Sequence, residues 1–127
     1  MACGSTQISQ RSVASPYIGA RNYIPDIVTL ANYRRHIGHV ITFSGYVFDV
    51  RRSRRGLDYA VMFENTSWTK GLKMVTFKGG VRKLGGAARL RSFKGKTLTI
   101  RGLLIYNAVF GPEIIVDDPS MIMEVTP

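Results

Sequence analysis

A series of short β-rich runs that begins after Gly38 constrains the fold more than any other feature of the sequence. Residues typical of strands, with Val, Ile, Thr, Tyr and Phe prominent, gather in runs that Gly, Ser and Arg residues separate. The runs cover residues 39–50, 58–65, 72–78, 96–107 and 113–117. At 127 residues the chain suits one domain, since single domains span roughly 100 to 200 residues. The sequence therefore predicts one all-β domain with a small helical content.

Two of these runs repeat one pattern. Residues 38–47 and 95–104 share the order Gly, basic residue or His, any, apolar, Thr, apolar, any, Gly, any, apolar. Alternate apolar residues of such strands point inward, and a mid-strand glycine allows a sharp bend. The inward residues would be Ile41, Phe43, Val47, Leu98, Ile100 and Leu104. Strongly coiled strands suit a small closed barrel, and five is the strand count of the OB-fold. We therefore expect a five-stranded OB-type Greek-key barrel, with a β-sandwich as the alternative.

Two segments have helical spacing instead. Asp26 is a suitable N-cap, and apolar residues follow it at helical intervals until Gly38, which predicts a short N-terminal helix near residues 27–36. Residues 80–93 also have helical spacing, at the place where an OB barrel carries its plugging helix. Each glycine of the Gly85–Gly86 pair weakens a helix by about 1 kcal/mol relative to Ala. We expect this second helix to be short or broken.

The N-terminal segment differs in composition from the rest. Residues 1–25 are rich in Ser, Gly, Gln and Ala, which predicts an extension or flexible arm, with the OB-fold domain over residues 26–127. Cys3 is the only cysteine, so an intrachain disulfide and a cysteine-based metal site are excluded. Residues 2–5 resemble the end of a bacterial lipoprotein cleavage site, which would place a lipid on Cys3 after removal of a signal peptide. The absence of acids from this segment also fits an organelle transit peptide.

No apolar run approaches the roughly 18 to 20 residues that a membrane span requires. We therefore expect a cytoplasmic protein without a transmembrane segment. A lipid-anchored protein of the bacterial envelope is the alternative.

The charge balance points to a polyanionic partner. Against 8 Asp and Glu, 18 Lys and Arg give a formal net charge of +10. A basic surface gains affinity for DNA or RNA because phosphate neutralisation releases condensed counterions. Anionic lipid and a ribosome-like assembly are the competing partners.

Several short motifs resemble a known family. The stretch 27–45 is similar to the helix, Gly and Val-Thr-Val-any-Gly opening of bacterial OB-fold nucleic-acid-binding domains of the tRNA-anticodon-binding type. The stretches 93–102 and 112–122, with Tyr106 between them, resemble the last two strands and the Asp-Pro-Ser ending of that family. The resemblance spans roughly residues 27–125 and specifies architecture better than ligand. It implies an OB domain, with nucleic acid as the ligand class.

Four arginines occupy the turn between the first two runs. Arg51, Arg52, Arg54 and Arg55 place guanidinium groups in a loop that borders the ligand groove of an OB barrel. Guanidinium forks fit phosphate and also stack on bases. A solvated hairpin tip is the alternative.

A track of further basic residues follows the arginine turn. It includes Lys73, Lys78, Arg82 and Lys83, and acids concentrate instead in the last 15 residues. This segregation favours a one-sided binding surface, with a merely solvated face as the alternative.

Aromatic residues supply the second requirement of single-strand recognition, which is stacking. If Ile41 and Phe43 point inward, Tyr46 and Phe48 point outward beside the arginines. Asn107 and Phe110 near the last turn are candidates on the other groove wall. On the second run, the family resemblance implies that Tyr59, Val61 and Phe63 point inside. It leaves no aromatic residue of that run on the face where stacking residues usually lie, which counts against a strong sequence-independent single-strand binder. Trp68, in a polar loop, is either an exposed indole or a lid, and alternation does not orient Phe77.

Sequence signatures of enzymes are missing. The Gly95–Thr97 stretch mimics the end of a P-loop but lacks its upstream glycine, and His36 and His39 have no ligand partners for a metal. We therefore expect a non-catalytic protein without metal or cofactor that binds single-stranded DNA or RNA through its phosphate backbone. The alternative is a protein-interaction or scaffold module, with partners bound through the N-terminal arm, in an envelope or secretion complex.

Overall fold

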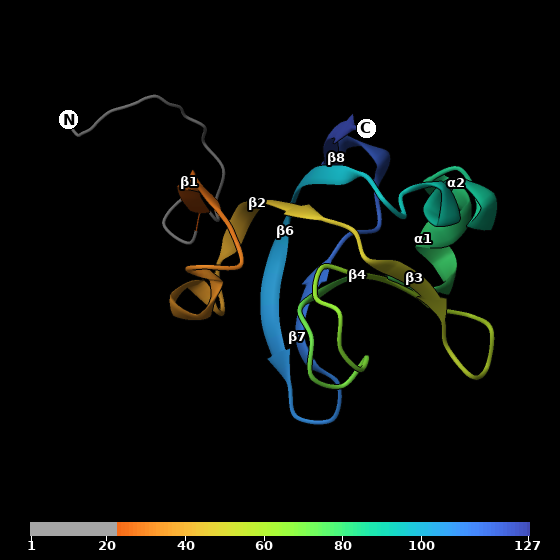
Figure 1. The fold of residues 1–127 in the computed structure, drawn as a ribbon, viewed down its shortest axis with the longest axis horizontal. Coiled ribbons are helices and arrows are strands. Elements are labelled where there is room, and N and C mark those ends of the chain that lie inside the picture. Colours follow the sequence, from red (N-terminus) through yellow and green to blue (C-terminus); the bar gives the residue numbers. More distant parts are fainter. Residues whose placement is uncertain (1–22) are drawn as a thin grey trace.

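The computed structural model of the chain describes residues 23–127. In this range, an eight-stranded sheet is accompanied by two short α-helices and two 3-10 helices (Figure 1). The strands are β1 (Tyr23–Val28), β2 (Val40–Tyr46), β3 (Asp49–Arg52), β4 (Tyr59–Met62), β5 (Lys73–Thr76), β6 (Thr97–Asn107), β7 (Gly111–Ile115) and β8 (Ile122–Thr126). The helices are η2 (Tyr33–His36), α1 (Lys78–Lys83), α2 (Ala87–Ser92) and η3 (Pro119–Met121).

The sheet is mixed and open. Its strand order is β1-β2-β6-β7-β5-β4-β3, and β8 pairs with β6 beside this path. The β1–β2 and β5–β7 pairs are parallel, and the remaining pairs are antiparallel. The predicted all-β, five-stranded OB-type barrel is therefore wrong, because the structure is mixed α/β with an open sheet.

The open path has a local cause at β2. One edge of β2 pairs with β1 and the other with β6, so neither edge is left for β3. The chain changes partners after β2: the Val47 amide donates to the Lys96 carbonyl, and the Phe48 amide donates to the Met62 carbonyl. β3 then pairs with β4. The predicted run 39–50 thus supplies two strands at different places in the sheet.

The predicted N-terminal helix at residues 27–36 is also wrong. The chain forms β1 and, after a turn, only the four-residue η2. Ile24 precedes Pro25, a position that favours extended backbone, and the β-branched pair Ile27–Val28 favours a strand. The pairing of β1 with β2 shifts register between Ile24 and Ile27, and Val28 is buried. The boundary predicted at residue 25 falls inside β1, whereas the predicted arm and Cys3 otherwise lie outside the described residues.

The second predicted helix is confirmed in its broken form. It consists of α1 and α2, separated by Gly85 and Gly86 with φ angles of 103° and 91°. Glycine adopts such positive φ angles without the steric penalty of other residues. Leu84 and Leu90 anchor the helices in the core. No helix within residues 23–127 is both long and apolar enough to cross a membrane.

The predicted inward residues form the core. Ile41, Phe43, Val47, Leu98, Ile100 and Leu104 are fully buried, as are Val61 and Phe63, with Tyr59 nearly so. The rings of Phe43 and Phe63 pack with their centroids 4.6 Å apart. Burial of each such side chain stabilises the fold by about 1.5–3 kcal/mol. The face of β5 and β7 opposite this core contributes to the pocket described next.

Candidate functional site

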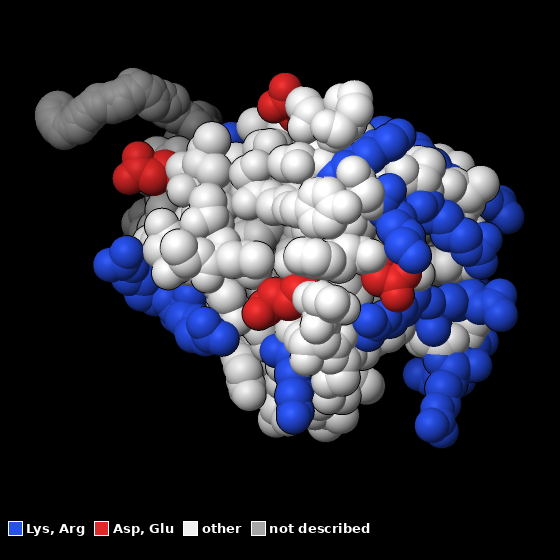
Figure 2. Space-filling view, in the orientation of Figure 1, with Lys and Arg blue, Asp and Glu red and all other residues white. Residues whose placement is uncertain are grey.

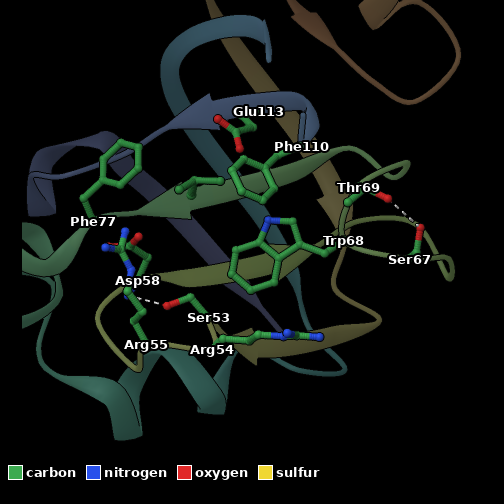
Figure 3. A pocket seen from close by; sticks show the side chains of 11 residues that line it. Ser53, Arg54, Arg55, Asp58, Ser67, Trp68, Thr69, Phe77, Phe110 and Glu113 are labelled. Atoms are coloured by element: carbon green, nitrogen blue, oxygen red, sulfur yellow. Dashed lines mark hydrogen bonds between the residues drawn. The ribbon is translucent and has the colours of Figure 1, made fainter. Parts of the chain in front are cut away.

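A pocket of about 570 Å³ lies where several loops meet one face of the sheet (Figure 3). The loop between β3 and β4, the loop between β4 and β5, the β6–β7 turn and the start of α1 all contribute to it. Its lining residues are Ser53, Arg54, Arg55, Asp58, Ser67, Trp68, Thr69, Val75, Phe77, Phe110 and Glu113. The volume lies within the range of roughly 300–1,000 Å³ that is typical of small-ligand sites.

The sheet supplies two adjacent residues of this pocket. Along the parallel strands β5 and β7, Met74 and Ile114 point into the core. Side chains alternate along a strand, so Val75 and Glu113 point to the opposite face and into the pocket. The register places Glu113 beside Lys73.

Three aromatic rings line the pocket. Trp68 comes from the β4–β5 loop, Phe77 precedes α1, and Phe110 belongs to the β6–β7 turn. Phe77 and Phe110 are 46% and 45% exposed, so both rings are open to a ligand. The Asn107 side chain accepts from the Val109 and Phe110 amides at 2.8 and 2.9 Å and so organises the turn that presents Phe110.

Arg54 lies on the side of the pocket away from Glu113, with Trp68 between them in the view of Figure 3, and Arg55 lies beside Asp58. Their loop is ordered by its backbone: Ser53 donates to the Asp58 carbonyl and Gly56 to the Ser53 carbonyl, both at 2.8 Å. Arg52, Arg54 and Arg55 are exposed and make no ion pair with residues 23–127. These three guanidinium groups are available to an anion.

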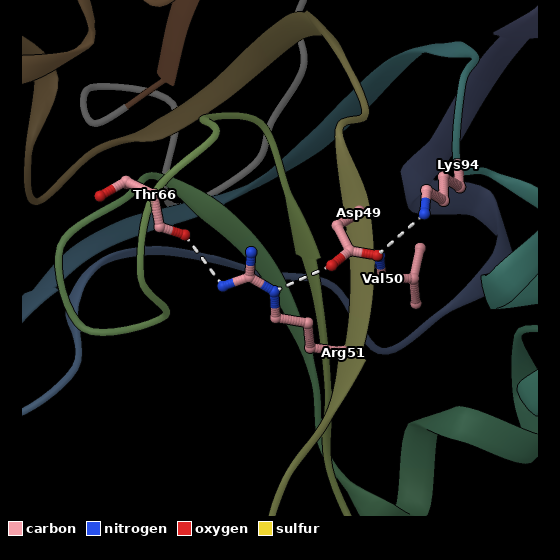
Figure 4. Close-up of polar contacts among 5 residues, drawn as sticks. All are labelled: Asp49, Val50, Arg51, Thr66 and Lys94. Atoms are coloured by element: carbon pink, nitrogen blue, oxygen red, sulfur yellow. Dashed lines mark hydrogen bonds and ion pairs between the residues drawn. The ribbon is translucent and has the colours of Figure 1, made fainter.

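Arg51 has a different role. It is bound to Asp49 at 3.0 Å and donates to the Thr66 carbonyl at 2.9 Å (Figure 4). The hydrogen bond from Arg51 holds the pKa of Asp49 below its ordinary value, and Lys94 adds a second cation at 3.6 Å. Arg51 therefore ties β3 to the β4–β5 loop, and its charge is already neutralised.

Lys73 requires a correction as a candidate nucleic-acid contact. Its side chain is fully buried, and Nζ donates to the carbonyls of Gly71, Phe110 and Pro112 at 2.8, 2.6 and 3.1 Å. Burial lowers the pKa of Lys73 to about 8, against the opposing effect of Glu113 and Glu64. Lys73 fastens the β6–β7 turn to β5 and does not reach the surface.

Glu113 is the most unusual group of the pocket. It is only 4% exposed, and its carboxyl accepts no hydrogen bond from any residue in the range 23–127. Burial raises the pKa of the Glu113 carboxyl above its ordinary value; Lys73 opposes this shift, and the Asp58 charge adds to it. Figure 3 shows the carboxyl beside the Phe110 ring.

Tyr46 and Phe48 are exposed, as predicted, but they do not line the pocket. Their rings form an edge-to-face pair with centroids 5.0 Å apart. The backbone between them bonds to the turn before β6, since the Gly95 amide donates to the Val47 carbonyl. The two candidate sets of aromatic residues are therefore separate.

The remaining candidates lie on or next to α1. Lys78, Arg82 and Lys83 are exposed, and Lys78 directly follows the pocket residue Phe77. Figure 2 shows Lys and Arg side chains gathered on the side of the molecule that carries β3, α1 and α2. The basic residues of α1 thus begin at Lys78, directly after the pocket residue Phe77.

Sequence reasoning anticipated the Arg54–Arg55 loop and Phe110 on two walls of one groove, and the structure brings them together. It left Trp68 undecided, did not orient Phe77 and gave Glu113 no role. The indole in a polar loop was the only signal for these three. In sequence comparisons, no protein-family profile and no curated protein matches the chain. The family resemblance stays a prediction from short motifs.

Proposed function

We propose that the protein binds single-stranded nucleic acid, with phosphates on Arg54 and Arg55 and bases against Trp68, Phe77 and Phe110. The observation that carries this proposal is the meeting of two free guanidinium groups and three aromatic rings in one pocket. Single-strand binders combine a cationic surface along the backbone with rings on which bases stack, each worth about 1–3 kcal/mol. The function is binding without catalysis.

The shape of the pocket favours a single strand over a duplex. Bases in a duplex are stacked on one another, so their faces are closed to protein rings, whereas unpaired bases can be splayed into a pocket. The net charge of +10 adds attraction to the backbone that is independent of sequence.

Trp68 gives a direct assay because it is the only tryptophan of the chain. Titration with a short single-stranded oligonucleotide at low salt is expected to quench its fluorescence. A duplex of the same length is expected to bind more weakly.

Two double variants distinguish the effect of the pocket arginines on binding from the effect of the net charge. Arg54→Ala with Arg55→Ala removes two cations from the pocket, and Arg34→Ala with Arg35→Ala removes two exposed cations from η2, which lies near the other end of the sheet (Figure 1). Each phosphate contact on a single strand contributes about 0.7 to the slope of log K against log salt. The pocket variant is expected to lower this slope by about 1.4, and the η2 variant to leave it nearly unchanged. If the slope of log K against log salt is the same in the two variants, the pocket is not the binding site.

A further inference from the structure

No side chain or backbone group within residues 23–127 donates a hydrogen bond to the acceptor atoms of Glu113, although the group is buried. A carboxylate has two oxygens and about four lone-pair sites. Lys73 is the nearest cation in the register, but an ammonium group has three donors, and the carbonyls of Gly71, Phe110 and Pro112 take all three. Glu113 thus gains attraction from the Lys73 charge without a hydrogen bond.

A ligand in the pocket can supply these donors, because Glu113 lines the pocket. The Phe110 ring lies beside the carboxyl in Figure 3, and Phe77 lines the same pocket, so the site suits a flat, aromatic ligand with N–H groups on one edge. The charges are ordered as well. Arg54 lies on the side of the pocket away from Glu113, and Asp58 lies beside Arg55 on the β3–β4 loop, so a ligand with an anionic end toward Arg54 and a donor edge toward Glu113 is complementary to the pocket. A nucleotide has this arrangement.

The four bases differ in the edge that they offer to a carboxylate. Guanine presents two adjacent donors, N1–H and the N2 amino group. Adenine and cytosine each present one amino group beside a ring-nitrogen acceptor, and thymine or uracil presents one N–H between two carbonyl acceptors. An ionised carboxylate only accepts, so adjacent acceptors on the base repel it. Two parallel hydrogen bonds to one carboxylate are the strongest of these pairings.

We propose that Glu113 makes the pocket selective for an unpaired guanine, whose N1–H and N2 amino groups bind the two carboxylate oxygens. This inference rests on the proposed function and adds a base preference to it. The ionised form of Glu113 is the form that binds. The charged groups around it are Lys73 from β5, Asp58 from the β3–β4 loop, and Arg54 and Arg55, which also line the pocket.

The test uses four single-stranded thymidine octamers with one central guanine, adenine, cytosine or hypoxanthine, titrated against the full chain by Trp68 fluorescence. Guanine is expected to bind at least about five-fold tighter than adenine or cytosine, in line with one bidentate base contact. Hypoxanthine keeps N1–H and lacks the amino group, so an intermediate affinity is expected.

Glu113→Gln is the decisive variant because an amide offers one donor and one acceptor. It is expected to abolish the guanine preference and to shift the order toward adenine and cytosine, whose edges match an amide. Glu124→Gln on β8, an exposed carboxyl outside the pocket, is the matched control and is expected to keep the wild-type order. Thermal melts of both variants check that the fold is retained. The order of base affinities measured with the wild-type chain tests the guanine preference without any variant.

The outcomes separate the two proposals. Salt-sensitive binding of all four octamers with equal affinity would overturn the guanine inference and leave single-strand binding in place. A guanine preference that survives in Glu113→Gln would overturn the role of Glu113. Failure of every octamer to bind at low ionic strength would overturn both.

Discussion

Glu113 is held in the pocket at the expense of stability. Its carboxyl is buried and receives no hydrogen bond from residues 23–127, whereas most buried polar groups in folded proteins are hydrogen-bonded. Buried groups with a raised pKa occur preferentially at functional sites. Glu113 has a raised pKa and lines the pocket together with Trp68, Phe77 and Phe110.

The first prediction concerns the pH dependence of stability. Because the pKa of Glu113 is higher in the folded chain than in the unfolded chain, the folded state keeps a proton that the unfolded state releases. The free energy of unfolding therefore falls as pH rises from about 4.5, the ordinary pKa, through the folded pKa. Glu113→Gln does not titrate, so its stability relative to wild type is expected to improve over this window. Urea midpoints from pH 4 to pH 8 measure the difference.

Glu124→Gln serves as the control in the same series, since that carboxyl is exposed. Its stability relative to wild type is expected to stay constant over the pH range. A constant difference for Glu113→Gln as well would mean that Glu113 titrates normally.

Lys73 contributes to the site without touching a ligand. Lys73→Met keeps the length of the side chain and leaves three buried carbonyl groups without their donor. We expect a loss of about 3 kcal/mol in the free energy of unfolding. Lys78→Met, on the exposed start of α1, is expected to change it by less than about 0.5 kcal/mol. Denaturant unfolding of the two variants is the measurement, and a similar small loss in both would show that Lys73 is dispensable.

At the scale of the elements, the glycines that repeat in the sequence permit close packing. A Cβ atom on Gly102 would lie 2.5 Å from the Ile115 carbonyl oxygen, which belongs to the backbone of β7 and cannot rotate away. Gly102 thus lets β6 pass directly beside β7. The related Gly45 on β2 makes room for the rings of Phe43 and Phe63.

Gly102→Ala is accordingly expected to lower the free energy of unfolding by about 1–3 kcal/mol, the usual cost of overpacking. Gly79→Ala is the matched control, because a Cβ there meets no atom within 4 Å and the residue lies in α1. Alanine favours a helix over glycine by up to about 1 kcal/mol, so this control is expected to be neutral or stabilising. Thermal melts of the two variants decide the matter; a neutral Gly102→Ala would mean that β6 and β7 can separate locally.

At the scale of the elements, the sequence predicts which residues point inward but not how the strands pair. Alternation is a local property, so the inward residues Ile41, Phe43 and Leu98 and the break at Gly85–Gly86 were predictable. Pairing is not local: the apolar spacing after Asp26 predicted a helix, although Pro25 and the β-branched Ile27–Val28 favour a strand, and the pairing with β2 is what forms β1. That extra strand is what turns the predicted barrel into an open sheet.

Part of the candidate site was likewise predictable from the sequence, and part was not. A turn rich in arginine is visible in the sequence, and so is an aromatic residue near a turn. The environments of Lys73 and Glu113, by contrast, were not predictable. Lys73 is bound by three carbonyl groups, and Glu113 receives no hydrogen bond from residues 23–127. Both environments depend on the pairing of strands that lie about 40 residues apart in the chain.

At the scale of the whole molecule, the charge distribution gives two salt effects of opposite sign. The net charge of +10 destabilises the compact state by self-repulsion, and salt screens this repulsion. In the absence of ligand, we therefore expect the melting temperature to rise with sodium chloride concentration. A bound oligonucleotide stabilises the folded state by about 2.7 kcal/mol when its free concentration is 100 times its Kd.

The stabilisation by a bound oligonucleotide weakens with salt, because counterion release drives binding to the phosphate backbone. At low salt, a single-stranded octamer with a central guanine is expected to raise the melting temperature by several degrees, and this increment is expected to vanish at high salt while the ligand-free melting temperature rises. If the pocket binds phosphate as proposed, the Arg54→Ala, Arg55→Ala double variant is expected to keep the salt-dependent rise of the ligand-free melting temperature and to lose most of the octamer increment, since the two arginines are a small part of the total charge. An octamer increment that is independent of salt would point instead to apolar contacts alone with Trp68, Phe77 and Phe110, and it would exclude the arginines as phosphate ligands.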